Sequence, residues 1–183
     1  MSITTKTGDN GKTSLSFGEI VFKDDLRVVA CGTIDELCSS MGLSKSLVRD
    51  KVTKEIVEGI QCDLFIIGAE IATPPKFLSK LKKRINTKYV LKLEKFIKQW
   101  EGKKKFESRC FCLPGENQIS SSFDVSRTVA RRAERVLVTL KRKKIIKNPD
   151  IIIYLNRLSD LLYLFARDYE KRLKKVAKTR GGT

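Results

Sequence analysis

The sequence of 183 residues contains no histidine. Histidine is the commonest metal ligand in proteins, and it is the side chain that most often exchanges protons near neutral pH. Its absence excludes a Ser-His-Asp or Cys-His mechanism within this chain. Any chemistry performed here therefore depends on other side chains or on a bound cofactor.

The five cysteines do not have the spacing of a metal site. No two of them form a CxxC pair, and no histidine is present to complete a zinc site; the five are Cys31, Cys38, Cys62, Cys110 and Cys112. An odd number of cysteines without a signal peptide predicts reduced thiols in a cytoplasmic protein. No apolar run approaches the roughly 20 residues that a membrane-spanning helix needs.

Positive charge is abundant, with 38 Lys and Arg against 21 Asp and Glu and a formal net charge of +17. This excess favours an anionic partner, which could be a nucleotide, a nucleic acid or a membrane surface. Basic runs occur at Lys80–Arg84, Lys103–Lys105 and Lys141–Lys144. Aromatic residues do not interleave with these runs and no nucleic-acid recognition motif is present. A solvated lysine coat would explain the runs equally well.

Apolar residues recur at three- and four-residue spacing in five stretches, which predicts five amphipathic helices. We expect these helices at residues 24–48, 51–72, 87–100 and 118–143 and from 148 onwards, with the basic segment after residue 170 frayed. Strand signals are weak, and residues 1–23, rich in Gly, Thr and Ser, are expected to form a loop. This pattern predicts one all-α domain, a ferritin-like five-helix bundle over residues 24–178 with a tail at 179–183.

The helix expected at residues 118–143 has two contrasting faces. Its core face is predicted to carry Val125, Val129, Ala133, Val136, Leu137 and Leu140. The opposite arc carries Arg127, Arg131, Glu134 and Arg135. Arginine presents planar, permanently charged donors that suit phosphate. Four arginines within nine residues, Arg132 included, therefore predict an anion-binding site. On the last helix, Asn156, Asp160 and Arg167 are expected to share a face off the apolar stripe.

Five motifs in this order resemble the PduO-type ATP:cob(I)alamin adenosyltransferase family, and together they extend over nearly the whole chain. They are Thr5–Ser14, Gly32–Leu37, Phe111–Gly115, Ser126–Arg135 and Tyr154–Asp160. Each motif is weak alone, because the TGDxG sequence of the first is short and the RRAER sequence of the fourth suits any surface helix. The resemblance implies a cobalamin adenosyltransferase-like five-helix bundle that assembles as a homotrimer, with ATP bound between neighbouring subunits.

The resemblance also implies an enzyme of the cob(I)yrinic acid a,c-diamide adenosyltransferase type. Such a transferase moves the 5′-deoxyadenosyl group of ATP to cob(I)alamin, forms adenosylcobalamin and releases triphosphate, with Mg²⁺ as a cofactor. Reduced cobalt is the nucleophile, so the protein has to place the ribose 5′ carbon over cobalt and neutralise the leaving group. A flavoprotein reductase and an adenosylcobalamin-dependent mutase are the further partners it implies.

The residues assigned by this resemblance fall on both the N-terminal loop and the arginine helix. ATP binding is expected from Thr5, Lys6, Thr7, Gly8, Thr13, Lys23, Arg131, Arg132, Glu134, Arg135 and Asn156. Arg131 is expected to contact phosphate, and Glu134 to place Mg²⁺ or to hold an arginine. Arg127 is expected to pair with Asp35 of a neighbouring subunit, so that Arg131, Asp35 and Arg127 are assigned to catalysis. Phe111 is expected to line the corrin pocket.

Two positions depart from the family pattern. Glu116 and Asn117 follow the Leu-Pro-Gly sequence, where the family often has a second glycine, and Asp124 stands where a histidine is common. Both departures lie towards the corrin side of the expected site. Two other functions stay open: a basic helical nucleic-acid-binding protein, and a family member that binds nucleotide or cobalamin without catalysis.

Overall fold

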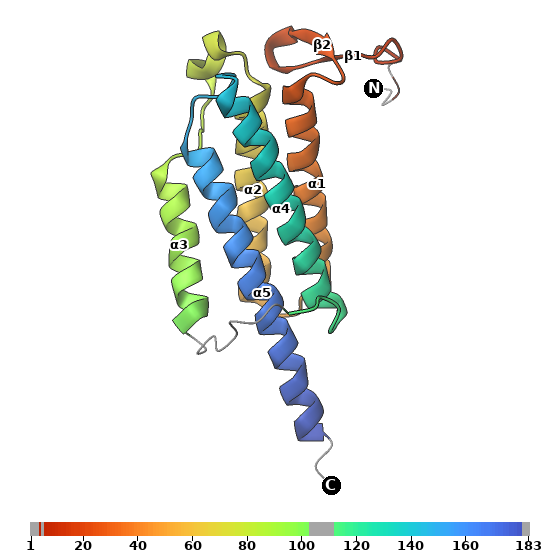
Figure 1. The fold of residues 1–183 in the computed structure, drawn as a ribbon, viewed down its shortest axis with the longest axis vertical. Coiled ribbons are helices and arrows are strands. Elements are labelled where there is room, and N and C mark those ends of the chain that lie inside the picture. Colours follow the sequence, from red (N-terminus) through yellow and green to blue (C-terminus); the bar gives the residue numbers. More distant parts are fainter. Residues whose placement is uncertain (1–3, 5, 103–111, 181–183) are drawn as a thin grey trace.

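The protein is a bundle of five long helices, seen in a computed structural model that describes residues 4, 6–102 and 112–180, with side chains up to residue 170. The helices are α1 (Leu26–Leu47), α2 (Lys51–Ala72), α3 (Thr87–Gly102), α4 (Gln118–Arg142) and α5 (Asp150–Arg180). This order confirms the predicted five-helix architecture. Figure 1 shows α1, α2, α4 and α5 running side by side, with α3 at the outer edge against α5. Helix α5 continues to Arg180, beyond residue 170, where the sequence predicted fraying.

Polar caps and prolines set the helix ends, as the sequence suggests. The side chains of Asp25, Asp50 and Asn117 accept hydrogen bonds from backbone N–H groups in the first turns of α1, α2 and α4. Helix α2 ends before Pro74, and the short 3₁₀ helix η2 (Pro75–Lys80) follows it. Among the described helices, none is long and apolar enough to cross a membrane.

The core is built from the apolar stripes of the helices. The predicted stripe of α2, from Ile56 to Ile71, and that of α5, from Ile151 to Tyr169, are both buried. Aromatic rings join three helices, because Phe165 of α5 lies 5.1 Å from the Trp100 ring of α3 and 5.2 Å from the Phe123 ring of α4. These contacts hold α3, α4 and α5 together around the region described below.

The buried face of α4 is rotated from the predicted one. Val125 is 54% exposed and Val136 is half-buried, so the prediction for Val125 was wrong. Ser122 and Ser126 are buried instead. Ser126 Oγ donates to the carbonyl oxygen of Ser122 at 3.0 Å and lies 3.3 Å from Ser44 Oγ of α1. Because these hydroxyls find acceptors locally, small serines can be buried where α4 crosses α1.

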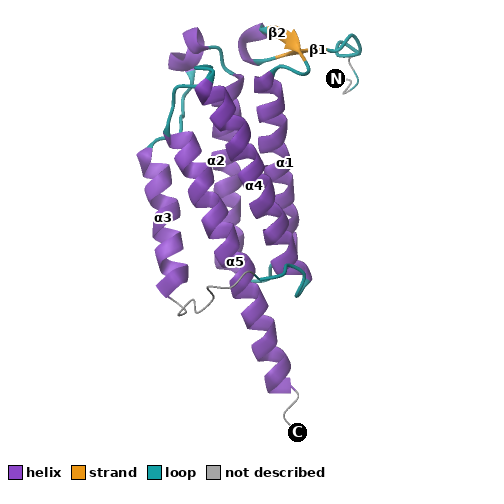
Figure 2. Ribbon diagram, in the orientation of Figure 1, coloured by secondary structure: helices purple, strands orange, loops and turns teal. Residues whose placement is uncertain are grey.

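The sequence predicted only a loop for the N-terminal segment. The structure shows that this segment also contains a small hairpin. Strands β1 (Lys12–Ser14) and β2 (Ile20–Phe22) pair antiparallel, with Lys12 opposite Phe22 (Figure 2). Between them lies the short 3₁₀ helix η1 (Ser16–Gly18), where Gly18 adopts a φ of 78°. Strands of three residues are too short to show a clear alternation of apolar and polar positions.

Candidate functional site

A cleft of about 710 Å³ opens over α5, between α3 and α4. Its lining residues are Glu94, Ile97, Lys98 and Glu101 of α3, Arg127 and Arg131 of α4, and Arg157, Ser159, Asp160, Tyr163 and Leu164 of α5. Cations from three helices therefore converge on one opening, together with several carboxylates. This mixture of charges suits a ligand with both anionic and hydrogen-bonding groups.

The two arginines that α4 contributes differ in how they are held. They are four residues apart, so both lie on the same face of the helix. Arg131 is exposed, whereas Arg127 is half-buried and its Nε donates a hydrogen bond to Asp124 Oδ1 at 3.1 Å. The structure therefore brings the predicted residues Arg127 and Arg131 together, one anchored and one exposed.

A hydrogen-bonded network beside the cleft joins α3, α4 and α5. Asn156 Nδ2 donates to Glu134 Oε1 at 3.3 Å, and Asn156 Oδ1 accepts from Arg157 Nη1 at 2.8 Å. Arg157 Nε in turn donates to Glu94 Oε1 at 3.1 Å. Glu134 and Asn156 were selected separately from the sequence, and the structure places them in direct contact. Sequence reasoning assigned no role to Arg157, although it adjoins Asn156 within the same motif.

Asp160 is another carboxylate that lines the cleft close to this network. Partial burial raises the pKa of Asp160 above its ordinary value, and the Arg157 and Arg131 guanidinium groups oppose that rise. Arg157 Nη1 lies 3.9 Å from Asp160 Oδ2. Asp160 and Arg131 both line this opening.

The remaining members of the arginine cluster point elsewhere. Arg132 forms an ion pair with Glu36 of α1, on a different side of α4 from the cleft. Arg135 is exposed and does not line the cleft. Arg132 directly follows Arg131, so it faces a different direction, whereas Arg135 lies one turn further along the helix and beyond the residues that line the cleft.

The N-terminal loop brings two of its predicted residues together. A Cβ atom added to Gly8 would lie 3.1 Å from Lys23 Nζ, so the lysine side chain passes closely over this glycine. The turn is closed by the N–H of Gly11, which donates to the carbonyl oxygen of Gly8 at 3.2 Å. Lys6 and Thr7 are exposed, and Thr13 lies in β1. The predicted residues Thr5 and Phe111 lie outside the described residues.

The loop and the cleft belong to different parts of one chain. Figure 1 shows the hairpin beyond the first turn of α1, away from α3 and α5. Asp35 also lies apart from the cleft, because it lines a groove of about 380 Å³ between α1 and α2 together with Phe65. Within one chain, Asp35 and Arg127 therefore line two separate openings.

Another cavity, of about 390 Å³, lies where the hairpin meets the end of the bundle. The Arg27 guanidinium there donates two hydrogen bonds to Glu19, at 2.7 and 2.8 Å. This hydrogen-bonded pair lowers the pKa of Glu19 and raises that of Arg27. Glu70 is held by Arg84 at 2.6 Å and by Asn148 at 3.1 Å. These contacts tie the hairpin to α1, and α2 to the segments that carry Arg84 and Asn148.

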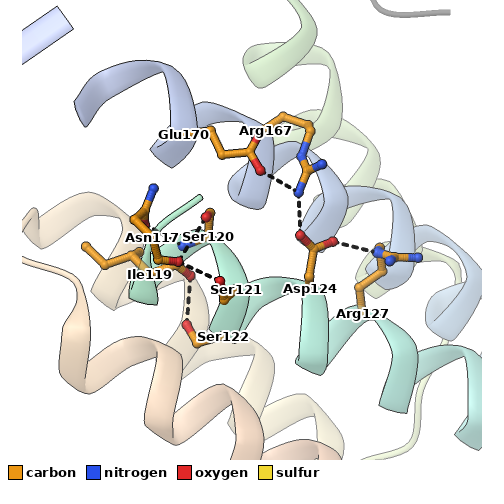
Figure 3. Close-up of polar contacts among 9 residues, drawn as sticks. All are labelled: Asn117, Ile119, Ser120, Ser121, Ser122, Asp124, Arg127, Arg167 and Glu170. Carbon is orange, nitrogen blue, oxygen red and sulfur yellow. Dashed lines mark hydrogen bonds and ion pairs between the residues drawn. The ribbon is translucent and has the colours of Figure 1, made fainter. Parts of the chain in front are cut away.

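Sequence reasoning missed the partner of Asp124. Asp124 is buried, and its Oδ2 accepts a hydrogen bond from Arg167 of α5, as Figure 3 shows. Arg167 is buried as well, although the sequence predicted it off the apolar stripe, on a face shared with Asn156 and Asp160. The spacing of three residues between Asp124 and Arg127 is the one sequence signal that points to this cluster.

The protein is a helical bundle with an arginine-lined cleft, and guanidinium groups of this kind suit a phosphorylated ligand. The chain belongs to the cobalamin adenosyltransferase family, whose sequence model matches residues 3–169.

Known proteins similar to this chain include corrinoid adenosyltransferases. One from Citrobacter freundii is 38% identical over 165 residues, which cover 90% of this chain and 93% of that protein. The corrinoid adenosyltransferase PduO of the same organism is 36% identical over 167 residues, and this chain spans only 49% of its length. A variant of the PduO-type ATP:corrinoid adenosyltransferase from Lactobacillus reuteri, solved with cobalamin and ATP, superposes with a TM-score of 0.84 at 35% identity. That match covers 93% of this chain and 96% of the other.

These findings confirm the family resemblance inferred from the five motifs. They support the adenosyltransferase over the nucleic-acid-binding alternative.

Proposed function

We propose that this protein transfers the 5′-deoxyadenosyl group of ATP to cob(I)alamin, forming adenosylcobalamin and releasing triphosphate. The observation that carries the proposal is the pair Arg127 and Arg131 at the mouth of one cleft, in a chain that matches the family over residues 3–169. Fixed guanidinium groups near a departing polyphosphate stabilise the charge that develops on it. Cobalt supplies the nucleophile, which agrees with a chain that has no histidine.

The chain's own residues divide into those that hold the leaving group and those that orient the nucleoside. Arg131 is exposed at the cleft and has no ion-pair partner among the described residues, so its guanidinium is available to a triphosphate. Gly8 and Lys23 offer a close backbone approach and an ammonium group for the same anion. Asn156 is fixed by Glu134 and Arg157, so its amide is preorganised for a ribose or a base.

We infer that the complete site forms between copies of the chain, in a homotrimer. The hairpin lies away from α3 and α5 (Figure 1), whereas the cleft is lined by α3, α4 and α5, so one copy would supply the N-terminal loop and another the cleft. The groove between α1 and α2 carries Phe65, whose surface is 69% exposed, beside Asp35. Covering this apolar surface would bring Asp35 of one copy to Arg127 of the next, as the family resemblance predicts.

Mg²⁺ fits this site as a companion of the triphosphate. Among the described residues, no group of three or more Cys, Asp or Glu side chains is placed to hold a metal ion. Mg²⁺ commonly binds through one or two carboxylates plus substrate phosphates and water, so Glu134 would suffice as the protein's ligand. When bound, the ion would neutralise part of the leaving-group charge.

Several finer features remain predictions. The family resemblance is the basis for the role of Phe111 at the corrin and for the flavoprotein reductase and the mutase as partners. Cysteine usage is the basis for the cytoplasmic location. The division into a nucleotide-binding N-terminal loop at 1–23, a bundle at 24–178 and a tail at 179–183 also remains a proposal, with α5 extending into the last segment.

The proposal is tested by mixing the protein with MgATP and chemically reduced cobalamin without oxygen. We expect the absorption spectrum of adenosylcobalamin to appear only when protein and ATP are both present. The spectrum of this product should be lost on exposure to light, because light breaks the cobalt–carbon bond homolytically and leaves cob(II)alamin. A protein that binds MgATP and cobalamin but forms no such product would instead be a non-catalytic member of the family.

A further inference from the structure

We propose that Asp124 is a positioning residue that fixes the Arg127 guanidinium at the cleft. The inference deepens the proposed function and rests on it for its kinetic test. Asp124 precedes Arg127 by three residues on α4, so the two side chains lie on adjacent turns of one face. Asp124 itself does not line the cleft, and it would act only through the arginine.

Both oxygens of the Asp124 carboxylate are occupied by different arginines. Oδ1 accepts from Arg127 Nε at 3.1 Å, and Oδ2 accepts from Arg167 Nη2 (Figure 3). The Asp124 side chain is only 6% exposed. A buried carboxylate that accepts hydrogen bonds on both oxygens has little freedom to rotate, so it holds the half-buried Arg127 rigidly in place.

Arg167, the second arginine bound to Asp124, is itself held in place. Arg167 is buried, its Nη2 lies 2.9 Å from Glu170 Oε1, and its guanidinium packs 5.2 Å from the centre of the Tyr163 ring. Tyr163 also lines the cleft. The cluster thus contains two arginines and two carboxylates, and it runs from the interior of α5 to the cleft.

The hydrogen bond to Asp124 decides which donors Arg127 can offer a ligand. Arg127 Nε already donates to Asp124, so the two terminal Nη groups are the donors that Arg127 can offer to a ligand. Arginine has large rotamer freedom, and anchoring it before a ligand arrives removes that ordering cost from binding. The preorganised fork would serve the triphosphate or Asp35 of a neighbouring copy.

Aspartate can do this where the histidine common at this position cannot. A neutral imidazole offers one acceptor nitrogen, whereas a carboxylate offers two oxygens and a full negative charge. This chain therefore couples two arginines through one side chain, and the departure from the family pattern has a structural role.

The test is a double-mutant cycle on the full-length protein, measuring kcat and KM for ATP in the transfer reaction. Asp124→Asn keeps the shape but removes the charge and one acceptor. We expect kcat/KM for ATP to fall roughly tenfold, as for contacting groups that act together. In an Arg127→Met background, Asp124→Asn should cause no further fall in kcat/KM, because the arginine that Asp124 positions is absent. Equal losses in both backgrounds would overturn the proposal.

A matched control separates positioning from plain stability. Glu70 is another buried carboxylate that holds an arginine, Arg84, and it lies outside the cleft. We expect Glu70→Gln to lower the melting temperature while kcat/KM stays unchanged. If Asp124→Asn behaves like Glu70→Gln, Asp124 is structural only and the proposal is wrong.

A measurement on the unmodified protein covers the case in which Asp124→Asn does not fold. The Nε–H proton of Arg127, assigned by comparison with Arg127→Lys, should exchange slowly with solvent in nuclear magnetic resonance spectra. Fast exchange would contradict the anchoring. A slow Nε–H in a protein that makes no adenosylcobalamin would refute the proposed function and leave the anchoring intact.

Discussion

Individual side chains at the cleft divide into anchored and exposed cations. Arg127 is held by Asp124, and Arg157 is held by Glu94 and Asn156. Arg131 is exposed and forms no ion pair with a carboxylate among the described residues. Anchored arginines define the shape of the site, whereas an exposed arginine can close on an arriving anion.

Arg131→Ala tests this division of work. We expect kcat/KM for ATP to fall by roughly 100-fold or more, the loss typical of removing one fixed donor from a developing negative charge. The melting temperature should hardly change, because the side chain is exposed. Arg142→Ala, an exposed arginine at the end of the same helix, is the matched control and should retain activity. Equal activity in the two variants would remove Arg131 from the site.

Individual residues also show which features of the site the sequence can predict and which it cannot. Arg127, Arg131, Glu134 and Asn156 could be selected from the sequence, because the motifs that carry them are local. The pairing of Asp124 with Arg167 could not, since it joins residues 43 positions apart through tertiary packing. Val125 was placed in the core because a helical wheel counts valine as apolar and serine as polar, and it does not see which neighbour the helix packs against.

The secondary-structure elements follow local rules with one exception. Helix α2 occupies the predicted residues 51–72, because it has a long apolar stripe, an aspartate cap and a proline stop. The hairpin of β1 and β2 was missed, and it is held to α1 by the fork between Glu19 and Arg27. Phe17 adds a ring stacked 4.6 Å from Phe77. Long-range contacts of this kind leave no periodic signal in the sequence.

Glu19→Ala should loosen the hairpin from the bundle. The hydrogen-bonded Arg27 lowers the pKa of Glu19, so the pair stabilises the fold above the ordinary pKa of the carboxyl group. That contribution is lost as the pH falls through the lowered pKa. Hydrogen-exchange protection factors of the hairpin amides should therefore drop in the wild type at acidic pH, and already at neutral pH in the variant. Amides of α2 are the internal control, and unchanged hairpin protection in Glu19→Ala would contradict the account.

At the scale of the whole chain, the residues proposed to bind ATP lie in two separate places. The loop around Gly8 lies at the hairpin end, and the arginine-lined cleft lies on the side of α5 between α3 and α4. Nothing in the helix periodicity could reveal this, because the number of copies in an assembly leaves no trace in the amphipathic pattern. The resemblance supplied the homotrimer, and the separation of loop and cleft supports it.

Phe65→Glu tests that assembly. Placing a charge on the exposed apolar groove of α1 and α2 should prevent copies from associating, because the carboxylate would be buried next to Asp35 of the same chain. We expect sedimentation to report a trimer for the wild type and a monomer for the variant, with activity lost in the monomer. Leu91 of α3 is also exposed, at 57%, and offers a control because it lies outside the groove. An active monomeric Phe65→Glu variant would show that one chain holds a complete site.

The most direct measurement follows the atoms of ATP through the reaction. ATP labelled in the adenosyl group is mixed with the protein, Mg²⁺ and chemically reduced cobalamin, and a parallel sample carries the label in the γ-phosphate. The account predicts that the adenosyl label is recovered with the corrin and the γ-phosphate label with intact triphosphate, in equal amounts. Recovery of the γ-phosphate label as orthophosphate, with the adenosyl label remaining on ADP, would contradict it.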